Sequence, residues 1–437
     1  MKNLTVIIGL FLAMLGTAQA KVEVQQLTSP GGISAWLVEE HSIPFTALEI
    51  RFRGGSALDA PGKRGAISLM MATLEEGAAE LDSQGFAAAR EALAASFRFN
   101  VYDDVTTISA RFLTENRSEA MALLKTALHQ PNFDQVAVDR VREQVLSIIR
   151  SDATDPSDIA GQNFDELVWG GHPYASSRNG TLDSVASLTR ADMFDAKAQV
   201  FGLDRMYVSA VGDISAEELG ILLDELLGDL PATAAPLVDR ADYQLETGTT
   251  VIDFDTPQSV ALFGHQGIER DDPDYMAAYV LNEVFGGGGF ESRLMTEVRE
   301  KRGLTYGVST FLVPMEYGEL IMGQVRSDNS RMAESISVIR DEWAKIADTG
   351  LTQQELADAK TYLTGAYALR FDGNAPIARI LVGMQMIGLP VDYISTRNDQ
   401  INALTLAGIN RVARRIYQPG ALHFVVVGQP DGVETSN

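Results

Sequence analysis

The sequence predicts an α+β protein with two homologous domains, each an antiparallel-rich β-sheet packed with α-helices. Three observations lead to this prediction: an internal repeat, strand and helix patterns that recur in both halves, and a short linker between the halves. Hydrophobic residues make up 46% of the 437 positions and charged residues 22%, which is typical of a globular chain rather than a disordered one.

The repeat is the strongest of these observations. The segment from Leu182 to Asp213 recurs as Asn398 to Gln429, at a constant offset of 216 positions and without a gap. Each copy contains a Leu-Thr turn, a helical pattern and an apolar strand that ends in glycine, at Gly212 and Gly428. A fixed offset of this kind indicates one structural unit present twice.

Local patterns predict the elements of each unit. Short β-rich or alternating runs predict strands at residues 22–26, 35–39, 46–53 and 205–211, and again at 249–253, 259–267 and 421–427. Apolar residues with a period near 3.6 predict helices at 65–76, 117–129, 136–150 and 190–200, and again at 331–349, 353–370 and 407–417.

The domain boundaries follow from composition. Residues 1–20 have a positive start, a short apolar run and small residues before a cleavage point, so they predict a signal peptide. Residues 21–230 form the expected N-terminal domain, 231–248 a Pro-bearing linker, and 249–437 the C-terminal domain. No other apolar run reaches the length of about 20 residues that spans a bilayer. With no cysteine for lipid attachment, the expected location is the periplasm, as a soluble protein.

Charge limits the possible partners. The formal net charge is −24, which repels phosphate backbones and excludes nucleic acid as an expected partner. The negative charge favours either basic peptides or simple solubility, and the sequence leaves both open. The five histidines are too far apart for a short-spacing metal motif.

A glycine-rich segment is the most unusual local feature of the second half. Four consecutive glycines, Gly286, Gly287, Gly288 and Gly289, precede a charged helical stretch at 295–302, and a strand is expected after Gly303. No Gly-Lys-Ser/Thr follows, which excludes a P-loop. Taken singly, the glycines could be a hinge, Arg299 a surface ion-pair partner and Tyr306 an ordinary strand aromatic.

Residues 61–77 resemble the active-site helix of the pitrilysin/insulinase family of zinc peptidases, which carries His-x-x-Glu-His at this place. Here the three positions are Ser68, Met71 and Ala72, and the position of the third ligand, 76 residues further on, is Ile148. Catalytic zinc needs three N, O or S ligands and a water. These residues offer no suitable set, so we expect no metal in this chain.

The segment from Arg299 to Tyr306 resembles the Arg/Tyr motif of the same family, in which the two residues also stand seven positions apart. The resemblance implies that both side chains bind the substrate backbone and stabilise the oxyanion at a zinc site, as preorganised donors do. It also implies that Gly286 to Gly289 contribute to substrate binding, and that the two domains face each other like a clamshell around a peptide-sized chamber.

A chain that lacks the zinc ligands but keeps the Arg/Tyr motif implies that two chains together form the complete active site. The leading hypothesis is a non-catalytic subunit of a heterodimeric periplasmic zinc metallopeptidase, whose homologous partner carries the zinc and which acts on peptides. The alternative is a non-enzymatic peptide-binding or scaffold protein of the same fold. A hydrolase that uses Ser68 as its nucleophile is disfavoured, because the sequence offers no recognisable His or Asp partner for it.

Overall fold

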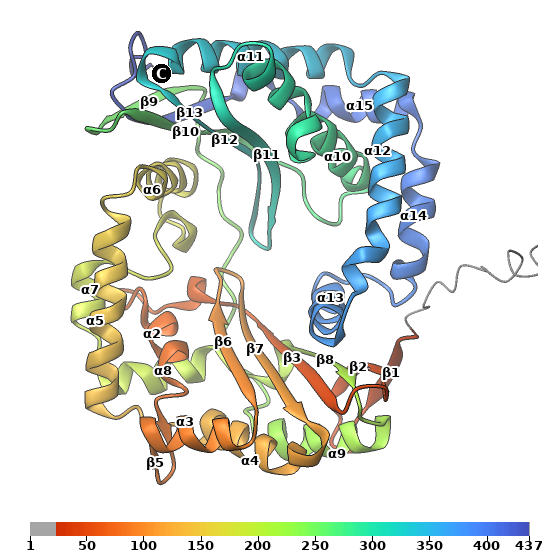
Figure 1. Ribbon diagram of the computed structural model, residues 1–437. Coiled ribbons are helices and arrows are strands. Elements are labelled where there is room, and N and C mark those ends of the chain that lie inside the picture. Colours follow the sequence, from red (N-terminus) through yellow and green to blue (C-terminus); the bar gives the residue numbers. More distant parts are fainter. Residues whose placement is uncertain (1–22, 437) are drawn as a thin grey trace, which may run out of the picture.

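The computed structural model describes residues 23–436, so the predicted signal peptide lies outside the described range. Two halves of similar construction face each other, as Figure 1 shows, with the first half in red to green and the second in green to blue. Each consists of a β-sheet with helices packed against it. The predicted α+β class with two homologous, facing domains is confirmed.

The first half (residues 23–230) contains a six-stranded sheet. Its only parallel pair is β2 with β8, and all other neighbours are antiparallel. From one edge to the other the strands are β1 (Gln25–Thr28), β2 (Ser34–Glu39), β8 (Met206–Gly212), β3 (Phe45–Arg53), β7 (Val105–Leu113) and β6 (Ser96–Val101).

The second half (residues 248–436) contains a five-stranded sheet of the same topology. Its strands in order are β9 (Gly248–Asp253), β13 (His423–Gly428), β10 (Gln258–Gln266), β12 (Gly318–Asp328) and β11 (Thr305–Met315). Again one pair is parallel, β9 with β13, and it occupies the place of β2 with β8. The two sheets are therefore copies of one arrangement, apart from the additional β1.

The glycines that end the repeated strands have the same backbone geometry. Gly212 has a φ of +142° and Gly428 a φ of +147°, values that side chains rarely tolerate. A Cβ at Gly212 would lie 2.2 Å from the carbonyl oxygen of Phe45, and one at Gly428 would lie 2.3 Å from the Ser259 hydroxyl. Both clashes are with the start of the neighbouring antiparallel strand, so the two positions are equivalent, as the repeat predicted.

Helices cover the outer face of each sheet and enclose one apolar core per half. In the first half they are α2 (Ala66–Thr73), α3 (Ser83–Ala92), α4 (Arg117–His129), α5 (Gln135–Asp152), α7 (Leu182–Ala186), α8 (Arg190–Val200) and α9 (Ala216–Leu227). In the second half they are α10 (Tyr275–Asn282), α11 (Met332–Thr349), α12 (Gln353–Gly365), α14 (Tyr393–Ala403) and α15 (Leu406–Ile416). Among residues 23–436, no helix is both long and apolar enough to cross a bilayer.

Several expected elements have different ends. The helix expected over 65–76, for example, spans Ala66–Thr73. For the first strand, expected at 22–26, residue 22 lies outside the described range, and the described strand spans Gln25–Thr28, where its pairing with β2 fixes it. The helix expected over 353–370 ends at Gly365, and the chain continues as a 3₁₀-helix over Ala366–Phe371.

Two helices pack across the boundary between the halves. Helix α6 (Pro156–Trp169) belongs to the first half but lies on β10 and β13 of the second sheet, and α13 (Asn374–Met386) belongs to the second half but lies on β3 and β8 of the first. Figure 1 shows α6 beside the upper sheet and α13 beside the lower one. The start of α13 is 218 positions after that of α6 (374 − 156 = 218), close to the repeat offset. Each half therefore contributes one helix to the sheet of the other half, in a reciprocal exchange.

Both crossing helices bury apolar side chains. From α6, Ala160, Phe164, Val168 and Trp169 join a cluster with Val260, Leu320, Val425 and Val427 of the second sheet. From α13, Ile377, Ala378 and Leu381 pack against Val38, Ala47 and Val211 of the first sheet. Hydrogen bonds from the Ser209 hydroxyl to the Ala378 carbonyl (2.6 Å) and from the Gln385 amide to the Val208 carbonyl (2.7 Å) fix α13 in place.

The β11–β12 hairpin provides a further contact between the halves. At its tip, the Glu316 backbone N–H donates to the Asp104 carboxylate (2.9 Å), and the Tyr317 N–H donates to the Tyr174 hydroxyl (3.1 Å). The Glu316 carboxylate in turn pairs with Arg53 (2.6 Å). The hairpin that begins near Tyr306 is thus held at its far end by the first half.

Helix α6 also carries a carboxyl group whose ionisation opposes folding. Burial, together with the nearby Asp103 charge, raises the pKa of Asp165 from 3.8 to about 7. Between pH 4 and pH 7 the native state therefore keeps a proton that the unfolded chain has lost, so the free energy of unfolding falls as pH rises through this window.

We expect Asp165→Asn to remove this pH dependence, because asparagine resembles the protonated carboxyl group. Urea denaturation should give similar stabilities for variant and wild type at pH 4, and a variant more stable by at least about 1 kcal/mol at pH 8, since each pKa unit corresponds to about 1.4 kcal/mol. Asp195→Asn, the same change at an exposed site on α8, is the control. A constant difference between Asp165→Asn and wild type at both pH values would contradict the assignment.

Candidate functional site

The four positions that correspond to zinc-site residues lie on two helices that pack together, α2 and α5. The Ser68 hydroxyl donates a hydrogen bond to the Arg178 carbonyl oxygen (2.7 Å). Met71 is 1% exposed and belongs to the apolar core, whereas the next residue, Ala72, is exposed. Ile148, on α5, is 48% exposed. The two helices that would hold a zinc site are present. Of the four side chains at its positions, one is buried in the core, two are exposed and one is hydrogen-bonded to the backbone.

These residues do not fit a zinc ion. Met71 and Ile148 stand where the family has its general base and third ligand, and Ala72 has no donor atom at all. The Ser68 hydroxyl is a poor ligand at neutral pH and is already used by Arg178. Over the described range 23–436, no three His, Cys, Asp or Glu side chains come together in a way that could hold a metal.

Tyr306 lies at a β-bulge at the start of the edge strand β11. Thr305 pairs with Ser327 and Val308 with Val325, so Tyr306 and Gly307 together face one residue of β12. The Thr305 hydroxyl donates to the Arg326 carbonyl (2.5 Å) and accepts from the Gly307 N–H (3.0 Å), which fixes the bulge. Bulges re-aim side chains, and here the Tyr306 side chain is 86% exposed.

Arg299 lies in the preceding turn, a short π-helix over Met295–Glu300 (η8). The Gly303 N–H donates to the Arg299 carbonyl (2.8 Å), and the Leu304 N–H donates to the Val298 carbonyl (3.0 Å). These bonds fix the connection between Arg299 and Tyr306. The nearby Glu297 carboxylate accepts from Lys301 (2.6 Å) and Arg302 (2.8 Å).

A cavity of about 320 Å³ opens beside the bulge. It is lined by Gly307 to Ser309 of β11, Gln324 to Arg326 of β12, Val260 of β10 and Ser157 of α6. The Arg326 guanidinium donates to the Ser157 hydroxyl (2.9 Å) across its edge. Helix α6 thus forms one wall of the space next to Tyr306.

The glycine-rich segment packs closely against β11. Gly286 is buried, and a Cβ there would lie 2.4 Å from the Thr310 hydroxyl. Asn282 and Thr310 form two hydrogen bonds at this point, of 2.9 and 3.1 Å. At Gly287 a Cβ would lie 2.8 Å from the Asn282 amide nitrogen. Gly286 therefore allows the helix end to approach the strand that carries Tyr306, and Gly287 leaves room for the Asn282 amide that bonds to this strand.

The last two glycines of the segment are in different surroundings. At Gly288 a Cβ would approach the Glu283 carbonyl to 2.6 Å, whereas Gly289 has a φ of +62° and open space around it. Substrate binding by Gly286 to Gly289 stays a prediction, and because Gly286 is buried its role in the fold is packing.

The two-domain fold, together with a zinc-site helix that has no zinc ligands, defines a peptidase-like protein with a degenerate zinc site. Comparison with known proteins agrees with this class. The family model described as "Peptidase M16 inactive domain" matches residues 187–363. A "non-peptidase homolog YmxG" of Helicobacter pylori is 27% identical over 427 residues, 97% of each chain. An uncharacterised zinc protease of Streptomyces coelicolor is 26% identical, over 81% of this chain and 78% of the relative.

Solved structures give the same result. A crystal structure of a "peptidase M16 inactive domain" from Pseudomonas fluorescens has a TM-score of 0.88 and 28% identity, covering 94% of this chain and 99% of that one. A protease from Helicobacter pylori has a TM-score of 0.84 at 15% identity and shows the shared fold alone. The chain is thus similar to M16 inactive-domain and non-peptidase proteins over almost its whole length, and the resemblance to the pitrilysin/insulinase peptidases is confirmed.

We expect the isolated chain to bind no stoichiometric zinc, and the double variant Ser68→His with Ala72→His to gain no peptidase activity. The base and the third ligand would still be missing, and Met71→Glu would place a charge in the core, which is costly without a partner. Metal analysis after dialysis against zinc tests the first statement, and cleavage of a fluorogenic peptide tests the second. About one tightly held zinc per wild-type chain, lost on mutation at Ser68, would contradict the expectation.

Proposed function

We propose that this chain is the non-catalytic subunit of a heterodimeric periplasmic zinc metallopeptidase. In this proposal the partner is a homologous chain that carries the zinc, and this chain supplies Arg299 and Tyr306 to the shared site. The similarity to M16 inactive-domain and non-peptidase proteins and the absence of zinc ligands on α2 support the first part. The periplasmic location rests on the predicted signal peptide, outside the described residues.

The exposure of Tyr306 is the observation that carries the proposal. An aromatic side chain that is 86% exposed buries little surface and contributes little to the fold. A hydrogen-bonded bulge nevertheless fixes its backbone, on an edge strand and beside a cavity of about 320 Å³. A phenol group held in this way is available to a ligand or to another chain.

The edge position of β11 offers a way to bind a peptide. β11 is the last strand of its sheet, so within residues 23–436 one side of its backbone has no neighbouring strand. An extended peptide can pair with such an edge through main-chain hydrogen bonds. A substrate bound there would have its carbonyl groups close to Tyr306.

The proposed chemistry assigns hydrogen-bond donation to this chain. The zinc of the partner subunit would supply Lewis-acid chemistry and an activated water. Tyr306 would donate its hydroxyl hydrogen to the oxyanion that develops on the substrate carbonyl, and Arg299 would bind the substrate backbone. The scaffold alternative, a peptide-binding protein without a role in catalysis, is supported by the description of the Helicobacter pylori relative as a non-peptidase.

We expect Tyr306→Phe to lower kcat of the reconstituted complex by roughly 100- to 1,000-fold, as removal of one oxyanion donor does. Only the exposed hydroxyl is lost, so complex formation should not change. Arg299→Lys should also impair cleavage, because lysine lacks the planar fork of arginine. The assay mixes each variant with the cognate zinc subunit and measures peptide cleavage and complex mass in parallel.

A matched control is available on the surface of the second half. Tyr362 on α12 is 61% exposed, so Tyr362→Phe makes the same chemical change at a comparable site and should leave kcat unchanged. Wild-type turnover by the Tyr306 and Arg299 variants in a fully formed complex would reject the assigned role and favour the scaffold function.

A further inference from the structure

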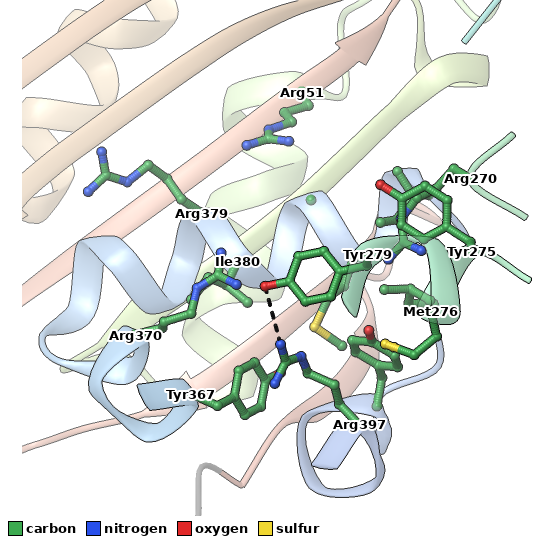
Figure 2. A pocket seen from close by; sticks show the side chains of 15 residues that line it. Arg51, Arg270, Tyr275, Met276, Tyr279, Tyr367, Arg370, Arg379, Ile380 and Arg397 are labelled. Atoms are coloured by element: carbon green, nitrogen blue, oxygen red, sulfur yellow. Dashed lines mark hydrogen bonds between the residues drawn. The ribbon is translucent and has the colours of Figure 1, made fainter. Parts of the chain in front are cut away.

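A cavity of about 440 Å³ lies between the two halves, and its walls are unusually basic for so acidic a protein. Five arginines line it, as Figure 2 shows: Arg51 from β3, Arg270 before α10, Arg370 after α12, Arg379 from α13 and Arg397 from α14. No Asp or Glu is among the described residues that line it. The volume falls within the range of small-ligand sites.

Two acidic side chains that follow Arg270 in the sequence are used elsewhere. Asp272 and Asp274 pair with Arg411 and Arg415 at 2.5 to 2.6 Å. None of the five cavity arginines forms a salt bridge with any residue in the described range 23–436, whereas many of the protein's other arginines do. The positive charge of the cavity therefore has no acidic side chain among its walls.

Arg397 forms a firmly held part of the cavity wall. It is 5% exposed and stacks on the rings of Tyr367 (4.3 Å) and Tyr279 (5.6 Å). Its guanidinium donates to the Leu363 carbonyl (3.1 Å), to the Asn398 side chain (3.1 Å) and, at 3.5 Å, to the Tyr279 hydroxyl, the bond drawn in Figure 2. A positively charged group is thus fixed by aromatic packing and by neutral acceptors only.

Arg51 is the contribution of the opposite half. Its Nε is buried without a hydrogen-bond partner, and Gly383 of α13 leaves the space in which its guanidinium lies, because a Cβ there would be 3.3 Å away. Burial lowers the pKa of Arg51, and the Arg379 charge adds to this, whereas Glu49 and Tyr102 oppose it. Glu49 lines the neighbouring cavity, where it accepts a hydrogen bond from Ser109 (2.8 Å).

We propose that this cavity binds the carboxylate-bearing end of an acidic peptide. Guanidinium groups bind planar carboxylates in bidentate fashion, and the arginines are mixed with apolar and aromatic walls from Tyr275, Met276, Met384 and Ile387. Those walls suit a peptide side chain next to the carboxylate. A bare inorganic ion has no apolar group that could contact them. The site is independent of the zinc partner and is compatible with both the subunit and the scaffold role.

The net charge of −24 does not prevent such binding. At physiological ionic strength the Debye length is about 8 Å, so exposed carboxylates on the outer surface are largely screened at the cavity. The arginines that line it act at contact distance and, for Arg51 and Arg397, from partly or fully buried positions where screening is weak. The local charge therefore determines which ligand is bound.

The test measures binding by the isolated chain, without a partner subunit. Fluorescence anisotropy would follow an N-terminally labelled hexapeptide that ends in three glutamates and a free carboxylate. The same peptide with three glutamines and an amidated end should bind at least about tenfold more weakly, and added salt should weaken the acidic peptide. Arg370→Gln and Arg51→Gln should each reduce affinity about tenfold, as loss of a charged hydrogen bond does.

Arg414→Gln, an equal charge change at an exposed site outside the cavity, should change affinity less than about twofold. Arg370 is exposed at the rim, so its variant tests the proposal even if Arg51→Gln unfolds the chain. Three results would overturn the proposal: equal affinity for the acidic and neutral peptides, an equal loss with Arg414→Gln, or displacement of the peptide by inorganic phosphate at matching concentrations.

Discussion

The reciprocal exchange of α6 and α13 is the constraint on which the arrangement of the two halves depends. A β-sheet has two faces, and an apolar face has to be buried against another element. In each half the outer helices cover one face only, and part of the other face is covered by a helix that belongs to the opposite half. Neither half can therefore bury all of its apolar sheet surface alone, which makes the facing arrangement part of the fold.

The same exchange determines where ligands can bind. The cavity beside Tyr306 has Ser157 of α6 as one wall, and the basic cavity contains Arg379 and Gly383 of α13. Each site therefore combines a sheet of one half with a helix of the other. The β11–β12 hairpin links the site at Tyr306 to the first half, because its bulge carries Tyr306 and its tip contacts Asp104 and Tyr174. A change in the angle between the halves would alter both cavities together.

The sequence predicts those parts of the fold that depend on neighbouring residues alone. Helices α4 and α8 begin and end where they were predicted, and α8 has a capping box between Thr189 and Asp192. The repeat identified Gly212 and Gly428, whose positive φ angles are a local requirement. Strand β7 is not among the predicted strands. Its segment, Val105–Leu113, is rich in β-branched residues, and this local signal could have predicted it.

Features that depend on distant contacts were not predicted. The helical character of α6 and α13 is local, but their position on the opposite sheet follows from topology. The bulge at Tyr306 arises from pairing with β12 and from the Thr305 hydroxyl, neither of which a linear motif shows. The basic cavity was missed for the same reason, since Arg51 and Arg397 are 346 positions apart (397 − 51 = 346) and no short pattern connects them.

The residues of the two candidate motifs differ in how far packing explains them. On α2, Leu69 and Met70 are fully buried, Met71 fills the core and Ser68 is bonded to Arg178, so the helix remains useful to the fold without metal. Tyr306 is different, because 86% of its surface is exposed and its strand would pair equally well with a smaller residue there. Stability thus accounts for the altered zinc helix and leaves the tyrosine unexplained. For that reason the function of this chain is to be sought at the edge of β11 rather than at α2.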